Sequence, residues 1–276
     1  MKSALISQIV FVVTYIVIFQ LVVGRRSVTE SGLSIHVIDV GQGDGIYIEM
    51  NGNPVALIDG GNDYTVDKYI LEKTGLSCNF PLVVLSHDHG DHFVGFKRVL
   101  ERCNFDILRY NDVVLDGRAV PQSVKNNQKN KVKKTFDGEQ FVIRGVFIKL
   151  IVPYGNIHGM PKNLNDASVA LFAKYKDFEA LFLGDLEAGA QERIDLRKLK
   201  RMVTGRLDVL KMAHHGAING YSRELVSELK PRVCVISVGE FNTFGHPSPL
   251  VVEELEKLGC GVIRTDKAGN VVIKSR

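Results

Sequence analysis

The sequence predicts an α/β fold, a four-layer αββα sandwich preceded by one N-terminal transmembrane helix. Two observations point to this fold class. Residues 4–23 carry no charged side chain, and from residue 33 onward short β-rich segments separated by glycine and asparagine turns alternate with a few helices. So many strands with so few helices pack most readily as two facing sheets with helices on their outer faces.

The uncharged segment Ala4–Val23 is long enough to cross a bilayer. A helix of this length spans roughly 30 Å, the thickness of the hydrocarbon layer. A cleaved signal peptide is the alternative, but the apolar run exceeds the usual length of roughly 7 to 15 residues, and the following VVGRR has no small-x-small cleavage site. We therefore expect an uncleaved, single-pass anchor. Lys2 nearly balances Arg25 and Arg26, so these charges leave its orientation open.

The remainder of the chain has the composition of one globular domain. We expect residues 1–24 to form the anchor, 25–32 a linker and 33–276 the domain. With 45% hydrophobic and 24% charged residues, disorder is excluded. Four scattered cysteines without a C-x-x-C pair exclude a structural zinc knuckle and a disulfide scaffold, and we interpret them as ordinary buried or half-buried residues. A net charge of +4 permits a polyanionic partner without requiring one.

The first half of the domain combines a meander with a strand between two helices. Residues 33–40, 45–50 and 54–59 follow one another across short turns and predict an antiparallel meander. A helix over 66–73 precedes the apolar strand 81–86, and a second helix over 93–102 follows it.

The second half continues the alternation. We expect strands at 141–151, 168–175, 179–183, 208–212, 233–238 and 262–265, and helices at 187–196, 223–229 and 249–258. Residues 118–134 carry six Lys or Arg and no acid, which predicts an exposed loop or hairpin tip.

The segment SHDHGDH, residues 86–92, lies between a buried strand and a helix. Three histidines and two aspartates in six consecutive positions cannot be satisfied in a dry core, so they point to a metal site rather than a solvated polar loop. On such a turn His87 and His89 can face one cation, and Asp91 and His92 a second. Nitrogen and carboxylate ligands without thiolate suit Zn²⁺, Mn²⁺ or Fe, and two ions about 3.5–4 Å apart form a clamp for hydrolysis.

The pattern H-x-H-x-D-H after a strand resembles the signature of the metallo-β-lactamase superfamily. VALIDGG places Asp59 like the family's aspartate that buttresses the metal loop without binding metal. EALFLGDLE places Asp185 like the carboxylate that bridges both metals. The segments HVIDVGQGDGIYIE, NDASVAL, DVLKMAHHG and VISVGEFNTFGHPSP resemble, more specifically, the hydrolase domain of ComEC-type competence proteins. This resemblance covers roughly residues 33–273.

The resemblance implies two divalent metal ions, with zinc or manganese favoured. His87 and His89 would bind one ion, Asp91 and His92 the other, and Asp185 would lie between them.

Two further segments resemble ligand positions of the family. AHHG implies one more ligand from His214 or His215; the sequence does not say which, and the other imidazole would contact substrate. Many members carry an additional histidine where this chain has Asn165 and Asp166. The first metal site would then be completed by Asn165, Asp166 or water, which predicts a weaker site.

Three other residues are candidates beside this centre. His246 precedes a helix start and could hold a phosphate or act as general acid, with a capping or loop histidine as the alternative. Lys211 could reach a phosphate, with a solvated strand-end lysine as the alternative. The turn GQGD, residues 41–44, joins two strands, so we favour a tight turn against the metal loop, with Asp44 hydrogen-bonded locally, over a phosphate loop.

The predicted activity is metal-dependent hydrolysis of a phosphodiester, with a metal-bound hydroxide oriented by Asp91 or Asp185 as the nucleophile. His246, His214 or His215 would assist the leaving group. The basic stretches 118–134 and 193–206 favour a nucleic-acid substrate such as single-stranded DNA.

Two other functions remain open. One is a hydrolase of a cell-envelope phosphoester or other small substrate, resembling teichoic-acid phosphorylcholine esterases, and the other is a non-catalytic scaffold subunit. The chain has no room for the many membrane helices and oligonucleotide-binding barrel of competence transporters, so we expect a separate transport or envelope partner. The resemblance implies that the domain lies on the extracytoplasmic side of the membrane.

Overall fold

The computed structural model describes residues 32–76, 78–111, 131–154 and 163–275. The predicted anchor, residues 4–23, and most of the basic stretch 118–134 lie outside these ranges. Within them, no helix combines the length and apolarity needed to span a bilayer.

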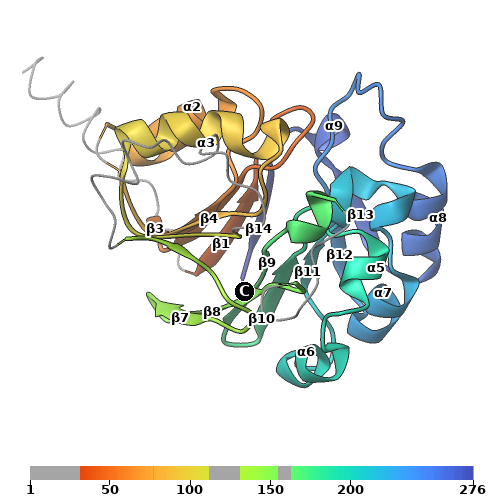
Figure 1. Ribbon diagram of the computed structural model, residues 1–276. Helices are drawn as coiled ribbons and strands as arrows, with labels where there is room; N and C mark the ends of the chain where they lie inside the picture. Colours follow the sequence, from red (N-terminus) through yellow and green to blue (C-terminus); the bar gives the residue numbers. More distant parts are fainter. Residues whose placement is uncertain (1–31, 77, 112–130, 155–162, 276) are drawn as a thin grey trace, which may run out of the picture. The chain divides into compact units, whose positions relative to one another are not determined.

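Two seven-stranded mixed sheets form the centre of the domain (Figure 1). The first sheet contains β1 (Leu33–Val37), β2 (Ile46–Met50), β3 (Asn53–Ile58), β4 (Asn79–Leu85), β5 (Asn104–Tyr110), β6 (Val132–Lys134) and β14 (Val271–Lys274). The second contains β7 (Gln140–Ile143), β8 (Val146–Ile151), β9 (Ala170–Tyr175), β10 (Phe178–Phe182), β11 (Val209–Lys211), β12 (Val233–Ile236) and β13 (Gly261–Arg264).

The strand orders are β14-β1-β2-β3-β4-β5-β6 and β13-β12-β11-β10-β9-β8-β7. Strands β1, β2 and β3 pair antiparallel, which confirms the predicted meander. Strands β3 to β6 continue in parallel, as do β10 to β13 in the second sheet. Parallel strands end at the same edge of a sheet, so the loops that follow them gather there.

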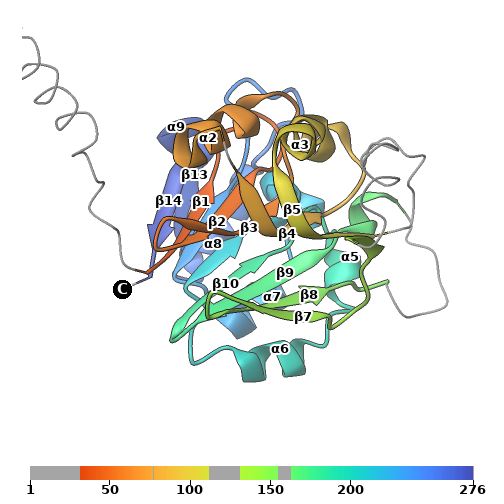
Figure 2. The same cartoon turned by 90° about the vertical axis from the view of Figure 1, so that its left-hand side faces the viewer.

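The helices cover the outer faces of both sheets, which confirms the predicted four layers (Figures 1 and 2). Aliphatic side chains from both sheets fill the space between them, and separate apolar clusters lie under the helices. The helices are α2 (Thr65–Thr74), α3 (Gly90–Arg102), α5 (Ala188–Gln191), α6 (Leu196–Met202), α7 (Arg223–Leu229), α8 (Pro249–Lys257) and α9 (Thr265–Ala268).

The histidine-rich loop, residues 86–92, runs into the first turn of helix α3, which begins at Gly90. This helix buries Phe96, Val99 and Leu100 against the first sheet, at the i, i+3 and i+4 spacing of an amphipathic helix. Gly95 permits a backbone contact, because a Cβ there would lie 2.1 Å from the carbonyl oxygen of Gly60. The turn after β3 therefore packs directly on α3.

Several predicted elements differ from the structure. The strand predicted at 141–151 is a hairpin, because the turn between β7 and β8 places Arg144 and Gly145 at positive φ. The helix predicted at 187–196 is shorter, because α5 ends at Gln191. A separate helix, α6, begins at Leu196 after its N-cap Asp195, whose carboxylate accepts a hydrogen bond from the backbone N–H of Lys198. The last residues of the stretch predicted as a loop, 118–134, form β6, and strands β5 and β14 had no prediction.

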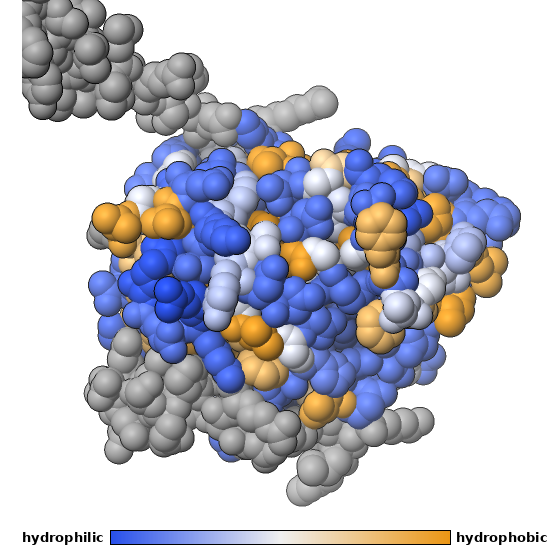
Figure 3. Space-filling view, turned by 90° about the horizontal axis from the view of Figure 1, so that it is seen from above, coloured by the Kyte–Doolittle hydropathy of each residue, from blue (hydrophilic) through white to orange (hydrophobic). Residues whose placement is uncertain are grey.

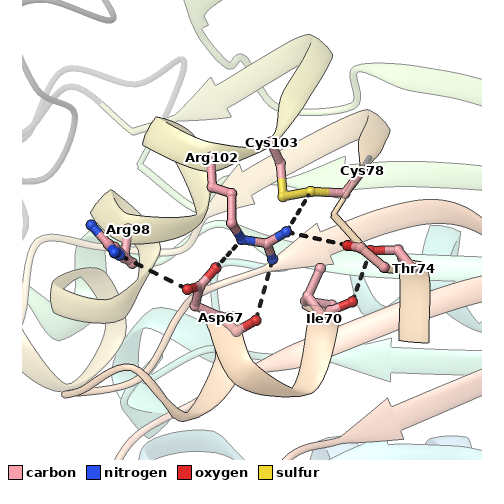
Figure 4. Close-up of a disulfide and its surroundings, with 8 residues drawn as sticks. Asp67, Ile70, Thr74, Cys78, Arg98, Arg102 and Cys103 are labelled. Atoms are coloured by element: carbon pink, nitrogen blue, oxygen red, sulfur yellow. Dashed lines mark hydrogen bonds and ion pairs between the residues drawn. A yellow bond between two sulfur atoms is a disulfide. The ribbon is translucent and has the colours of Figure 1, made fainter. Parts of the chain in front are cut away.

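The four cysteines are buried, as expected, but they are also paired in disulfides, which the sequence interpretation did not foresee. Cys78 and Cys103, 25 residues apart, form one disulfide, and Cys234 and Cys260, 26 apart, form another. The first joins the segment before β4 to the end of α3, where the strand-to-helix return brings them together (Figure 4). Arg102 lies beside it and donates hydrogen bonds to the Asp67 carboxylate at 2.6 Å and to Cys78 Sγ at 3.2 Å.

Candidate metal centre

The predicted site residues follow strands of both sheets. Asp59 follows β3, the histidine-rich loop follows β4, Asp185 follows β10, and the pair His214–His215 follows β11. The parallel arrangement of β3 with β4 and of β10 with β11 brings these loops to neighbouring sheet edges.

Three buried imidazoles each have one ring nitrogen engaged by the protein. Nδ1 of His92 lies 2.8 Å from Asp59 Oδ2, and Nδ1 of His215 lies 2.9 Å from the Ser237 carbonyl oxygen. Nδ1 of His87 lies 3.0 Å from Oγ of Ser86, whose own hydrogen is donated to Asp59 at 2.6 Å. When each Nδ1 donates a proton to these partners in a neutral ring, the Nε2 atom faces inward and can bind a cation.

The three Nε2 atoms converge on one carboxylate. Asp185 Oδ2 lies 3.3 Å from Nε2 of His92, 3.4 Å from that of His215 and 3.8 Å from that of His87. Asp91 Oδ2 lies 3.3 Å from His215 Nε2. His89 Nδ1 lies 3.0 Å from His87 Nε2, so all the predicted ligands of the loop point into the same space.

The ligand atoms form three groups, with the atoms of each within 4.8 Å of one another. His87, His89 and Asp185 form the first, and Asp91, His92 and His215 form the second. The third, Asp44, His92 and Asp185, overlaps both. The first two groups contain the residues that the resemblance implies for two ions.

The electrostatics of the cluster require positive charge. Burial disfavours every ionised form, yet Asp185 and Asp59 hold the pKa of His92 well above its usual value, and contacts led by Asp185 raise that of His215 to about 9. Burial alone would raise the pKa of Asp185, but His215 and His92 outweigh it and hold this pKa well below its usual range. Burial, with the charge of His92 next, lowers the pKa of His87. Imidazolium protons or bound cations can satisfy these carboxylates.

The residues present fit divalent cations. Three ligand atoms are buried and have no hydrogen-bond partner among the residues that the structure describes: His92 Nε2, His215 Nε2 and Asp185 Oδ1. Such atoms are costly in a protein interior unless something coordinates them. Imidazole nitrogen and carboxylate oxygen are ligands of zinc, manganese and iron, so the donor set does not distinguish among these metals.

The structure separates the two histidines that the sequence left equivalent. His215 is buried and belongs to the second ligand group. His214 is half-buried, and its Nε2 lies 3.4 Å from Asn165 Nδ2. Both have left-handed backbone angles, with φ of 49° and 53°, an uncommon conformation for these residues that aims the two rings apart.

Asn165 and Asp166 both form hydrogen bonds with Glu187, and Asp166 belongs to none of the ligand groups. Asn165 Nδ2 donates to Glu187 Oε1 at 3.2 Å, and Asp166 Oδ1 accepts from the Glu187 backbone N–H at 3.3 Å. Asn165 Oδ1 is buried and has no hydrogen-bond partner among the described residues. It is therefore available to a metal, a water or a substrate.

Both interpretations of Lys211 are wrong. Its side chain is fully buried, so it is neither solvated nor able to reach a phosphate. Its ammonium group pairs with the carboxylate of Asp44 and donates to the Gly184 carbonyl oxygen at 3.2 Å. The pair joins the turn after β1 to the end of β11 beneath the ligand cluster.

The GQGD turn does abut the metal loop, as predicted. The Asp44 N–H donates to the Asp91 carbonyl oxygen at 3.2 Å, and a Cβ on Gly43 would lie 2.1 Å from that oxygen. The Asp44 carboxylate, however, is not hydrogen-bonded locally, because its partner Lys211 lies 167 residues away.

His246 borders the cluster on the side of His214. The centroids of these two rings are 5.4 Å apart, and Nδ1 of His246 is buried without a hydrogen-bond partner in the described part of the chain. Burial, followed by the charges of His214 and His215, lowers the pKa of His246, so the ring is neutral at neutral pH.

The second basic stretch, 193–206, does not lie beside this cluster. It forms α6, which lies at the end of the domain opposite α2 and α3 in both views (Figures 1 and 2). Lys200 pairs with Glu228, and Lys198 lies 3.2 Å from Asp195.

Sequence reasoning missed three serines that orient the ligands. Ser86 bridges Asp59 and His87. Ser168 Oγ accepts the Asp185 N–H at 3.0 Å and lies 3.3 Å from His87 Nδ1, and Ser237 Oγ donates to the Gly43 carbonyl oxygen at 2.6 Å. Each serine lies within or beside a segment that resembles the family. That position was the one feature of the sequence that could have identified these serines as part of the site.

Comparison with known proteins agrees with this geometry. The sequence pattern of the metallo-beta-lactamase superfamily matches residues 38–240. Recombination protein 2 of Haemophilus influenzae is 27% identical over 244 residues, 86% of this chain and 28% of that protein. ComE operon protein 3 of Bacillus subtilis is 28% identical over 111 residues, 40% of this chain and 14% of that protein. The chain thus spans less than a third of the length of these curated relatives, which confirm the competence-type resemblance at modest identity.

Among solved structures, Zn²⁺-bound PqqB from Methylobacterium extorquens is similar, with a TM-score of 0.57 and 13% identity. The match covers 87% of this chain and 100% of that one. At this identity the likeness shows the fold alone.

Proposed function

This chain belongs to the metallo-β-lactamase superfamily, and we propose that it is a membrane-anchored phosphodiesterase that requires two divalent cations. The observation that carries the proposal is the convergence of three Nε2 lone pairs on the Asp185 carboxylate, with the Nδ1 atom of each ring engaged elsewhere. In this proposal His87, His89 and Asp185 hold one cation, and Asp91, His92 and His215 hold the other, with Asp185 shared.

When bound, the cations would supply a water-derived nucleophile at neutral pH and neutralise charge that develops on a phosphoryl oxygen. The protein keeps the ligands ready for this task. Asp59 fixes the ring of His92, and the Ser237 carbonyl oxygen fixes that of His215, so neither ring reorients when a cation arrives.

His246, His214 and Asn165 border the centre and would contact the substrate. Because the pKa of His246 is lowered, its neutral ring would donate a hydrogen bond to a phosphoryl or leaving-group oxygen rather than act as a strong acid. The partnerless Oδ1 of Asn165 would bind a water or complete the first metal site.

A phosphodiester substrate, in particular single-stranded DNA, is supported by two relatives. Recombination protein 2 carries a role in recombination in its name, and ComE operon protein 3 supports the competence-type relationship. We propose that the hydrolase domain acts together with a separate transport or envelope partner.

The test is hydrolysis by the full chain, purified with Mn²⁺ or Zn²⁺, of labelled single-stranded DNA, bis-p-nitrophenyl phosphate, a phosphorylcholine ester and a lactam. We expect cleavage of the first two, and loss of that cleavage in His89→Ala. Cleavage of only the phosphorylcholine ester or only the lactam would replace the phosphodiester proposal, and equal activity of His89→Ala would contradict the metal assignment. Stoichiometric metal with no hydrolysis would favour a scaffold role.

The two disulfides support an extracytoplasmic location for the domain. They engage all four cysteines of the sequence. Disulfides form and persist in oxidising compartments and are rare where thiols are kept reduced. With residues 4–23 as the anchor, we propose that the domain faces the oxidising side of the membrane.

Removing either disulfide by a double serine substitution is expected to lower the free energy of unfolding by about 3 to 4 kcal/mol, because loops of 25 and 26 residues are closed. Denaturant titration of C78S/C103S and C234S/C260S measures this. Protein from acid-quenched cells should react with a maleimide only after reduction. Four free thiols before reduction would contradict both the pairing and the location.

A further inference from the structure

A series of stacked rings leads from the metal centre to the surface. The centroids of His215 and His246 are 6.4 Å apart, with 30° between the ring planes. Those of His246 and Phe244 are 5.8 Å apart, with 26° between the planes. Phe244 is 68% exposed, so the outermost ring of the series is open to solvent.

The segment that carries Phe244, residues 239–248, is tied to the rest of the fold. The side-chain amide of Asn242 donates to the carbonyl oxygens of Gly239 at 2.8 Å and His246 at 2.7 Å. Its Oδ1 accepts from the His246 N–H at 3.0 Å. The Ser248 N–H donates to the carbonyl oxygen of Gly216, directly after the ligand His215, at 2.9 Å. These hydrogen bonds fix the conformation of the loop that carries Phe244.

A protein interface would not explain these exposed rings well. Phe241, on the same loop, is 90% exposed. The face shown in Figure 3 is mainly hydrophilic, with apolar side chains in small, separate groups rather than one broad patch. Exposed aromatic rings beside a reaction centre suit a planar ligand that stacks on a single ring.

We propose that Phe244 is a platform on which the nucleobase next to the scissile phosphodiester stacks. This inference rests on the proposed function. It divides recognition into two parts, with the phosphate bound at the metal centre and the base on the loop. Glu240 is acidic and does not attract phosphate to the loop. Stacking on the base would therefore be the main contribution of the loop to binding.

The exposure favours a base over a quaternary ammonium headgroup. Cationic headgroups are held in cages formed by several aromatic rings. Phe244 and Phe241 are instead two-thirds or more exposed, and no ring contact joins them in the described part of the chain. An open ring can stack on a base of any sequence.

The test compares two labelled single-stranded octamers of equal length and charge, oligothymidylate and its abasic tetrahydrofuran analogue. Binding to the full chain is measured by fluorescence anisotropy with phosphorothioate linkages in both octamers, which resist cleavage and leave the metal ligands intact. We expect oligothymidylate to bind about 5- to 150-fold more tightly than the abasic octamer. Phe244→Ala should bring the two affinities within about twofold, and Phe244→Trp should retain the preference.

Phe136, 54% exposed in the connection between β6 and β7, provides the matched control. Phe136→Ala should bind both octamers as its parent does. Equal binding of both octamers by the parent, or an unchanged preference in Phe244→Ala, would overturn the platform. Binding of phosphorylcholine that depends on Phe244, without discrimination between the octamers, would overturn it in favour of a cationic headgroup.

The result of this binding test can be distinguished from the result of the hydrolysis test of the proposed function. A base preference that depends on Phe244 supports the platform even if the chain hydrolyses no unmodified oligonucleotide. Hydrolysis without any base preference would leave the phosphodiesterase standing and overturn the platform.

Discussion

Asp185→Asn is expected to leave the protein folded but without its full complement of metal. The substitution preserves size and removes the charge shared by the two ligand groups, while the amide cannot replace both carboxylate oxygens. Losing a residue that only orients a metal ligand typically costs 10- to 100-fold in affinity or activity, so loss of a shared ligand should lower phosphodiester hydrolysis by more than about 100-fold. Metal analysis should find at least one equivalent fewer than in the parent chain.

Asp177→Asn is the matched control, because Asp177 is an exposed carboxylate in the turn between β9 and β10. It should retain the metal content and activity of the parent. Full metal content in Asp185→Asn would refute the shared ligand. Circular dichroism of both variants distinguishes loss of metal from loss of fold.

Lys211→Met should destabilise the protein by about 3 to 5 kcal/mol, the usual cost of removing one partner from a buried ion pair. The substitution leaves the buried Asp44 carboxylate without its ammonium partner, with only the imidazoles of His92 at 3.9 Å and His215 at 3.7 Å beside it. The double variant Lys211→Met/Asp44→Asn removes both charges and should recover most of the loss. Denaturant titration of metal-free protein measures each free energy.

Lys198→Met provides the surface comparison, since Lys198 is 65% exposed in its ion pair with Asp195. Such pairs contribute about 0 to 1 kcal/mol, so its effect should be small. If the double variant were less stable than Lys211→Met alone, an unpaired Asp44 charge would not be the cause of the loss.

Local patterns predicted the meander, the helices on either side of β4 and the metal loop, because hydrophobic periodicity and histidine spacing lie within one stretch of chain. The pairing of Lys211 with Asp44 depends on where segments 167 residues apart meet, which no local pattern records. The choice between His214 and His215 likewise depends on two left-handed residues, and no residue type in AHHG requires that conformation.

The disulfides illustrate the same limit. Composition argued correctly that four cysteines cannot serve as the scaffold of a chain this long, but this says nothing about pairing. Cys78 and Cys103 meet because a strand and its following helix return to the same end of the layer. The hydrophobic pattern predicted the strand and the helix, but it did not predict which of their ends lie in contact.

The order of the first sheet has a consequence for how the protein matures. Strand β14 pairs with β1, and the Leu33 N–H donates to Ser275 Oγ, 242 residues further along the chain. Contacts between such distant residues carry a high entropic cost and form late in folding. The sheet that bears the metal loop is complete only after residues 271–274 have been synthesised. If the domain is exported, this sheet would be completed on the far side of the membrane, and the metal centre would draw on the metals available there.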